Sequence, residues 1–376
     1  MPPSPGFSPR SAQSRAAHLL TARRLWGVAT LSVATAVGVV LAGVLRGKSW
    51  EAMVSVHVAW EWVAVAVGLA VVRDVGYMVR LWVLARGELT PKRTASSILL
   101  WELASALTPS VVGGSAVATF LLHRNGLNWG RSLATVMSTA LLDELFFVVA
   151  IPTVAVVAGS HAFLPAAAPW VAGSLGAVFA GGVAFMAGLA AFLATALFAA
   201  PGWIYRRLHR LFQRPLLRRV ATPGQTLAAD LLQASRDLRS MSWQGWAVAS
   251  LATAVSWCAR FLTLNALLLA VLAPTQADGT GMDHLAVAAR QLAMWTVMLL
   301  SPTPGATGLA ELALPTFMEG VLPLALGAGT WAAAVLLWRG LTYHIYLLVG
   351  GALMPVWVAQ TSSHNRADSR TFEAHE

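Results

Sequence analysis

The sequence predicts an all-α polytopic membrane protein with about six transmembrane helices and two oppositely oriented re-entrant hairpins of broken helix, arranged as an inverted repeat. The first observation is composition. Of the 376 residues, 57% are hydrophobic and only 11% are charged, whereas soluble proteins carry about 25% charged residues. The second is that two apolar runs are each interrupted by proline and glycine. The third is that lysine and arginine gather in alternate loops, as expected of cytoplasmic segments.

The chain divides into a membrane domain over residues 25–359 and a cytoplasmic tail at each end, 1–24 and 360–376. The N-terminal tail is rich in proline, serine and arginine, which predicts disorder. The uncharged run at 25–45 is long enough for a span and too long for the core of a signal peptide. Further spans are expected over residues 54–84, 132–158, 169–199, 243–273 and 330–359.

The first broken segment covers about residues 95–123. Pro109 cannot continue a helix, and Gly113 and Gly114 follow it closely. Each arm is too short to cross a bilayer at about 1.5 Å per residue. Basic residues flank the segment on both sides, so it is predicted to enter and leave by the cytoplasmic face.

The second broken segment covers about residues 284–327 and contains the stretch SPTPGATGLAE. Pro304 ends a helix there, and Gly305 and Gly308 permit backbone angles that other residues avoid. The freed backbone groups cannot face lipid, so such a break is tolerated only inside protein or beside a water-filled cavity. Two segments broken in this way in corresponding halves of a chain point to a transport site.

The positive charges orient the chain in the membrane. Most of the 26 lysines and arginines lie in the tails, beside the first broken segment, or in the basic loop at 201–242. All of these are therefore predicted to be cytoplasmic, together with both termini. The second hairpin then opens to the opposite face. Apolar residues interleave with the first arginines of the basic loop, which favours an interfacial amphipathic helix and a solvated loop equally.

Three charged residues at membrane depth are candidates for a site, because a charge there costs roughly 2.5–3.5 kcal/mol on insertion scales. Glu311 follows the second break, at a helix start where the dipole also favours a purely structural acid. Arg339 lies deep in the last apolar run, and Glu144, together with its neighbour Asp143, holds a similar position in the first repeat. We expect Arg339 to attract a phosphate and to lie within ion-pair reach of Glu311. Other charges in apolar runs, for which pairing or reaching water is the structural alternative, are Arg73, Asp74, Glu102, Arg260 and Arg290.

These residues resemble the flippase-like transmembrane region of the lysylphosphatidylglycerol synthase family. The family's Pro–x–x–x–Gly–Gly break is matched at 109–114, and its Pro–x–Pro–Gly–Gly–x–Gly–x–x–Glu signature is matched at 302–311. Its later arginine corresponds to Arg339, and its carboxylate in the span after the first break corresponds to Glu144. The resemblance covers about residues 25–358 and implies the flippase region without the soluble aminoacyl-transferase domain.

The chain departs from that family pattern at three positions. Ser115 stands where the family often has an acidic residue, and Ala118 stands where it often has an arginine. Ala306 replaces the second glycine of the later signature.

The expected function is movement of a phospholipid or lipid-linked substrate between the leaflets of the inner (cytoplasmic) membrane. The net charge of +10 is explained by cytoplasmic loops, so no nucleic-acid partner is expected. No CxxC, HExxH or P-loop pattern occurs, so neither a metal, a cofactor nor a catalytic residue is expected. The alternatives are a non-transporting partner of a glycosyltransferase or lipid-modifying enzyme, and a lipid head-group transferase. The substrate-binding candidates are Glu311, Arg339, Glu144, Pro109, Gly113, Gly114, Pro304, Gly305 and Gly308.

Overall fold

The computed structural model describes residues 56–108, 110–165, 169–212, 221–275, 281–299, 301, 303–322 and 326–373. Over these ranges the chain is helical and forms no strand, which confirms the predicted all-α class. The predicted N-terminal tail at 1–24, the predicted first span at 25–45 and Pro109 lie outside them.

Within the described ranges, five helical stretches are long and apolar enough to cross a membrane. They match the five later spans predicted from the sequence, with ends that differ by a few residues. Two of them contain a π-helical turn, Thr195–Ala199 after α8 and Gly340–His344 between α14 and α15. The helices are α4 (Trp60–Leu84), α7 (Trp129–Ala158), α8 (Pro169–Ala194), α11 (Trp243–Leu272), α14 (Ala328–Arg339) and α15 (Ile345–Glu373).

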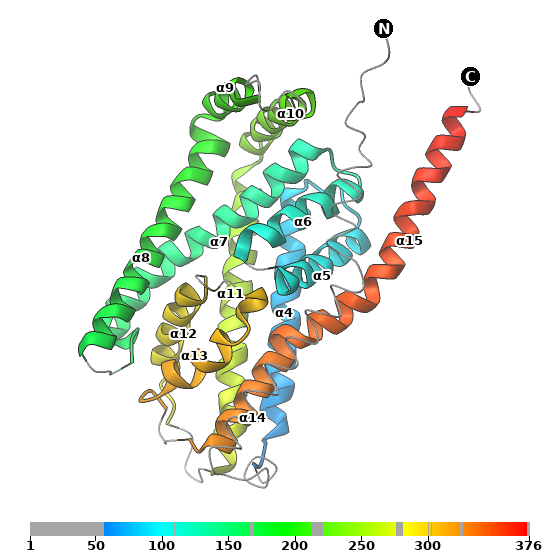
Figure 1. Cartoon of the computed structure of the whole chain (residues 1–376). Coiled ribbons are helices and arrows are strands. Elements are labelled where there is room, and N and C mark those ends of the chain that lie inside the picture. Colours follow the sequence, from blue (N-terminus) through cyan, green and yellow to red (C-terminus); the bar gives the residue numbers. More distant parts are fainter. Residues whose placement is uncertain are drawn as a thin grey trace.

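The helices α4 and α11 pack along each other at the centre of the bundle (Figure 1). Gly76 allows this close approach, because a Cβ at that position would lie 2.2 Å from the Ser256 hydroxyl oxygen. That hydroxyl donates to the Arg73 carbonyl oxygen at 3.0 Å. The opposite side of α4 carries Val71 and Val75, which are 57% and 51% exposed. Small residues inside and large apolar residues outside are the arrangement expected of a helix that contacts lipid.

The first broken segment consists of α5 (Pro91–Leu107) and α6 (Ser110–Arg124), which pack as an antiparallel pair. At the open end, Asn125 donates its side-chain amide to the Ser97 hydroxyl at 2.7 Å. At the closed end, Gly114 lies directly against Ser105. Thr108 leaves the helix with ψ 137°, the extended conformation favoured before a proline. Both ends of the pair therefore lie on the same side of the bundle.

The second broken segment consists of α12 (His284–Met298), a 3₁₀ turn at Pro304–Ala306 and α13 (Leu309–Met318). The freed carbonyls of the break are bonded locally, because Thr303 donates to the Thr307 carbonyl at 2.8 Å and Thr307 donates to the Pro304 carbonyl at 2.7 Å. Figure 1 shows α12 and α13 in the lower half of the molecule and α5 and α6 in the upper half. The 3₁₀ turn packs against α5, so the two breaks meet between these halves.

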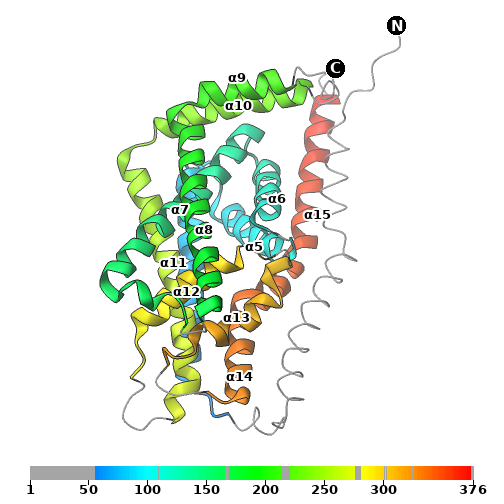
Figure 2. The ribbon, with the colours of Figure 1, turned by 60° about the vertical axis from the view of Figure 1, so that its left-hand side comes forward.

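The predicted basic loop at 201–242 is largely helical. It forms α9 (Pro201–Phe212) and α10 (Ala221–Arg239), which lie across one end of the bundle in Figure 2. Of the two alternatives for this region, the structure favours the amphipathic helix. The start of α5 lies at the same end, since Arg131 pairs with both Glu88 and Asp237 at 3.5 Å. Helix α15 continues into the predicted C-terminal tail as far as Glu373. Short 3₁₀ turns occur at Ser160–Ala162 and Ala273–Thr275.

Candidate functional site

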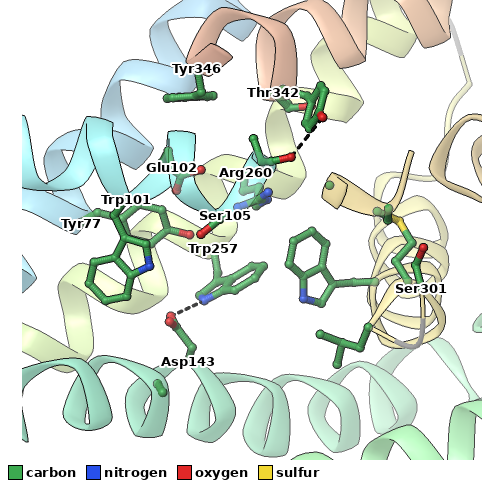
Figure 3. Close-up of a pocket in the computed structure, with 18 of the residues that line it drawn as sticks. Tyr77, Trp101, Glu102, Ser105, Asp143, Trp257, Arg260, Ser301, Thr342 and Tyr346 are labelled. Atoms are coloured by element: carbon green, nitrogen blue, oxygen red, sulfur yellow. Dashed lines mark hydrogen bonds between the residues drawn. The ribbon is translucent and has the colours of Figure 1, made fainter. Parts of the chain in front are cut away.

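A cavity of about 330 Å³ lies where the two broken segments meet (Figure 3). Helices α4, α5, α6, α7, α8, α11 and α12, the second break and the α14–α15 junction all contribute to its wall. The wall combines aromatic rings with charged and hydroxyl side chains. Its polar and aromatic residues include Tyr77, Arg80, Trp101, Glu102, Ser105, Asp143, Glu144, Trp257, Arg260, Trp295, Ser301, Thr303, Trp338, Arg339, Thr342, Tyr343 and Tyr346.

The predicted pairing of Glu311 with Arg339 is confirmed by the geometry. The Arg339 Nε atom lies 2.7 Å from Glu311 Oε1, and both side chains are buried. Arg339 also donates through Nη2 to the Gly305 carbonyl oxygen at 3.1 Å. Arg339 lines the cavity, whereas Glu311 is not among the lining residues. The pair therefore holds the second break onto α14, with the carboxylate behind the arginine.

Gly305 is held in the left-handed region with φ 56°. A Cβ at this position would lie 2.1 Å from the ring of Tyr343, so the residue could not carry a side chain without displacing that ring. Tyr343 in turn donates its hydroxyl to the Ala106 carbonyl oxygen at 3.1 Å. This carbonyl belongs to the last turn of α5, where helical partners are missing. One tyrosine thus connects the second break with the end of α5.

Two positions that follow Gly305 in the family signature also have positive φ. Gly308 has φ 89° and caps α13, and its N–H donates to Glu311 Oε2 at 2.6 Å. Ala306, which replaces a family glycine, has φ 52°. A left-handed conformation costs a non-glycine residue roughly 1–2 kcal/mol. This chain therefore holds Ala306 in a conformation that glycine adopts more readily.

Glu144 lines the cavity from α7, on a different element from Arg339. Its Oε2 atom is buried and has no hydrogen-bond partner among the described residues. Its neighbour Asp143 is engaged, because it pairs with Arg80 and accepts a bond of 2.8 Å from the Trp257 indole. Figure 3 shows that second contact.

A second buried cluster connects α4, α5 and α15. Arg73 Nη2 lies 2.9 Å from Asp74 Oδ1 and 3.3 Å from Glu102 Oε1, and the Arg73 side chain is only 2% exposed. Tyr346 donates its hydroxyl to Asp74 at 2.9 Å, and its ring centre lies 4.7 Å from the Arg73 guanidinium. Since Glu102 and Tyr346 line the cavity, this cluster forms part of its wall.

Arg260 enters the cavity from α11 and has a different environment from the other arginines. Its guanidinium carbon lies 4.4 Å from the centre of the Trp295 ring and 5.4 Å from that of Trp257. The side chain is half-buried. No ion pair joins it to any carboxylate in the described part of the chain.

The predicted site residues are partly brought together. Arg339, Gly305 and Glu144 line one cavity, while Glu311, Pro304 and Gly308 shape the second break behind it. Gly114 packs against Ser105. The surroundings of Pro109 and Gly113 lie outside what the structure describes.

Four of the charged or aromatic residues that line the cavity were not among the predicted substrate-binding residues, although Glu102 and Arg260 were noted as charges in apolar runs. Their charge or aromatic character in an apolar run was the available signal, but it does not show which way a side chain points. These residues are Arg80, Glu102, Arg260 and Tyr343. In the described part of the chain, no group of three or more histidine, cysteine or acidic side chains could hold a metal ion.

Comparison with known proteins places these elements in a family context. A model of the lysylphosphatidylglycerol synthase transmembrane region matches residues 24–350. The chain is also 24% identical over 255 residues to a UPF0104 membrane protein of Archaeoglobus fulgidus, across 65% of this chain and 70% of that protein. The family match includes both broken segments and every residue that lines the cavity.

Proposed function

Because the chain belongs to the family of lysylphosphatidylglycerol synthase transmembrane regions, we propose that it moves a phospholipid or lipid-linked substrate between the two leaflets. The substrate head group would occupy the cavity between the broken segments, and its acyl chains would remain in lipid. In this proposal the protein lies in the inner membrane with both termini in the cytoplasm, following the charge distribution.

The meeting of both breaks at one polar cavity supports this proposal most. Tyr343 bridges the second break and the last turn of α5, and charged residues from both halves of the chain line the same space. Each such charge is costly at membrane depth. Broken helices that meet around a polar site are the arrangement by which many transporters hold polar substrates in the bilayer.

The orientation of the two segments supports alternating access. The pair α5–α6 has its open end towards the side that carries α9 and α10, and α12–α13 lies towards the other end (Figure 1). We propose that the two pairs are re-entrant hairpins from opposite faces. A head group could then reach the cavity from either leaflet when one pair moves against the other.

The proposal is tested with the purified protein in liposomes that contain a fluorescent lipid. The label in the outer leaflet is quenched by a membrane-impermeant reductant, and the fraction that becomes quenchable over time reports translocation. We expect faster loss of signal than in protein-free liposomes. Signal loss at the protein-free rate, for a correctly folded protein and several head groups, would contradict transport and favour a role as a non-transporting partner of a lipid-modifying enzyme.

A further inference from the structure

We propose that Arg260 binds a phosphate group in the cavity, so that the substrate carries a phosphate in its head group. This inference rests on the proposed function and specifies the substrate class for the same cavity. It assigns the role of anion ligand to a residue of α11, in place of Arg339.

The pairing of charges around the cavity isolates Arg260. Arg80 pairs with Asp143, and Arg339 pairs with Glu311. In the remaining cluster, Arg73 pairs with both Asp74 and Glu102. Arg260 is the arginine of the cavity wall for which the described residues provide no carboxylate at ion-pair distance. An arginine kept at membrane depth without a counter-charge is a candidate for binding an anion.

The aromatic contacts of Arg260 hold its guanidinium without occupying its donors. The guanidinium lies over the Trp295 ring at 4.4 Å, and Trp295 and Trp257 meet edge to face with ring centres 5.1 Å apart. A guanidinium held by a ring face keeps its N–H groups in its own plane, where they match the oxygens of a phosphate in pairs. Figure 3 shows Arg260 within the cavity, among residues of α5 and α11.

Arg339 is less suited to this role. Its Nε faces Glu311 at 2.7 Å and its Nη2 donates to the Gly305 carbonyl. The ring centre of Tyr343 lies 4.0 Å from its guanidinium carbon. A phosphate at Arg339 would have to compete with a carboxylate that is itself buried and anchored to the Gly308 N–H. The residue is better explained as the support of the second break.

One alternative use of Arg260 is to balance the charge of Glu144. Both residues line the cavity, and the Glu144 Oε2 atom has no described hydrogen-bond partner. No ion pair joins the two side chains in this structure. The two roles predict different results for a double variant. If Arg260 only balances the charge of Glu144, removing both charges should restore the binding that is lost when Arg260 alone is removed. If Arg260 binds the phosphate, it should not.

The experiment compares binding by wild type and the Arg260→Gln variant in detergent. The probes are phosphatidylglycerol, a glucosyl diacylglycerol with the same acyl chains and no phosphate, and inorganic phosphate. Arg206→Gln is the matched control, since Arg206 is exposed on α9 and lies outside the cavity wall. We expect wild type and Arg206→Gln to bind phosphatidylglycerol at least about tenfold more tightly than the glycolipid, and Arg260→Gln to lose that preference.

Further variants separate the possible explanations. Arg260→Lys should retain part of the preference, because it keeps the charge and loses the planar fork. Equal preference for phosphatidylglycerol in wild type and Arg260→Gln, with both proteins folded, would overturn the assignment. Recovery of the preference in the double variant Arg260→Gln with Glu144→Gln would also overturn it, in favour of charge balance. Binding of inorganic phosphate as tight as that of phosphatidylglycerol would overturn the assignment of a lipid substrate.

These experiments distinguish failure of the Arg260 phosphate site from failure of the proposed transport function. If Arg260-dependent binding is observed but liposomes show no translocation, the phosphate site stands and transport is contradicted. If translocation is observed and is unchanged in Arg260→Gln, transport stands and the phosphate site is contradicted.

Discussion

The two broken segments are both interrupted by proline and glycine, and they differ in how their breaks are held. The break between α5 and α6 is closed by small residues, with Gly114 in contact with Ser105. The break before α13 is fixed by a buried ion pair between Glu311 and Arg339. It also contains three signature positions with positive φ, Gly305, Ala306 and Gly308, whereas the described residues of the first break have none.

This difference indicates that the two breaks differ in how easily they can move. A break held by van der Waals contact between small residues can slide or separate without uncovering a charge. A break held by a buried ion pair cannot, because separating the partners leaves an uncompensated charge. We infer that the second break is the fixed side of the cavity and that the contact between α5 and α6 is the one that can loosen, while α5 stays paired with α4 through Glu102 and Arg73.

Removing one partner of the ion pair should have the largest effect. Glu311→Gln leaves Arg339 buried without its carboxylate, so we expect a loss of about 3–5 kcal/mol in the free energy of unfolding. Unfolding in detergent, followed by circular dichroism, measures this loss. Adding Arg339→Gln should recover part of the stability, and strictly additive losses would contradict a coupled pair. Glu319→Gln, at the exposed end of the same helix, should change stability by less than about 0.5 kcal/mol.

A methyl group at Gly305 should have the next largest effect. The new Cβ would lie 2.1 Å from the Tyr343 ring at a residue with φ 56°, so we expect Gly305→Ala to cost roughly 1–3 kcal/mol and to reduce translocation. Gly188→Ala is the matched control, because a Cβ there meets no other atom within 4 Å. If both variants melt at the wild-type temperature, the second break is not held as tightly as its geometry indicates.

The corresponding substitution in the first break should have a smaller effect on stability, and a second substitution should compensate for it. In Gly114→Ala the new Cβ would lie 2.5 Å from the Ser105 hydroxyl oxygen, a small group that can rotate away, so we expect a loss of about 1 kcal/mol. The double variant with Ser105→Ala should regain most of it. Thermal melting of both proteins measures the difference. A loss as large as that of Gly305→Ala would remove the contrast between the two breaks.

Much of the fold follows from local patterns in the sequence. Apolar runs of sufficient length gave the five described spans, and the Pro/Gly clusters marked both breaks. The pairing of Glu311 with Arg339 was also predictable, because each is a costly charge in an apolar run and the break brings the two runs together. These features depend on residues near one another in sequence or on a small number of exceptional charges.

The wall of the cavity was less predictable, because it depends on how each helix is rotated about its axis. The π-helical turn Gly340–His344 adds a residue to one turn and changes which side chains face inward. It brings Tyr343 against Gly305, a contact that helical periodicity does not indicate. The pairing of Arg80 with Asp143 joins residues 63 positions apart. The aromatic environment of Arg260 likewise arises only when α11 and α12 pack together.

The most direct test of the cavity as a lipid pathway is to fill it with a large side chain and to measure the rate of lipid translocation. Thr342→Trp places a large ring at a lining position. Leu348→Trp, on the next helix and 70% exposed, adds the same ring on the outside. In the liposome assay we predict that Thr342→Trp loses most of its translocation while melting like wild type, and that Leu348→Trp retains it. Wild-type translocation by a folded Thr342→Trp protein would contradict passage of the head group through this cavity.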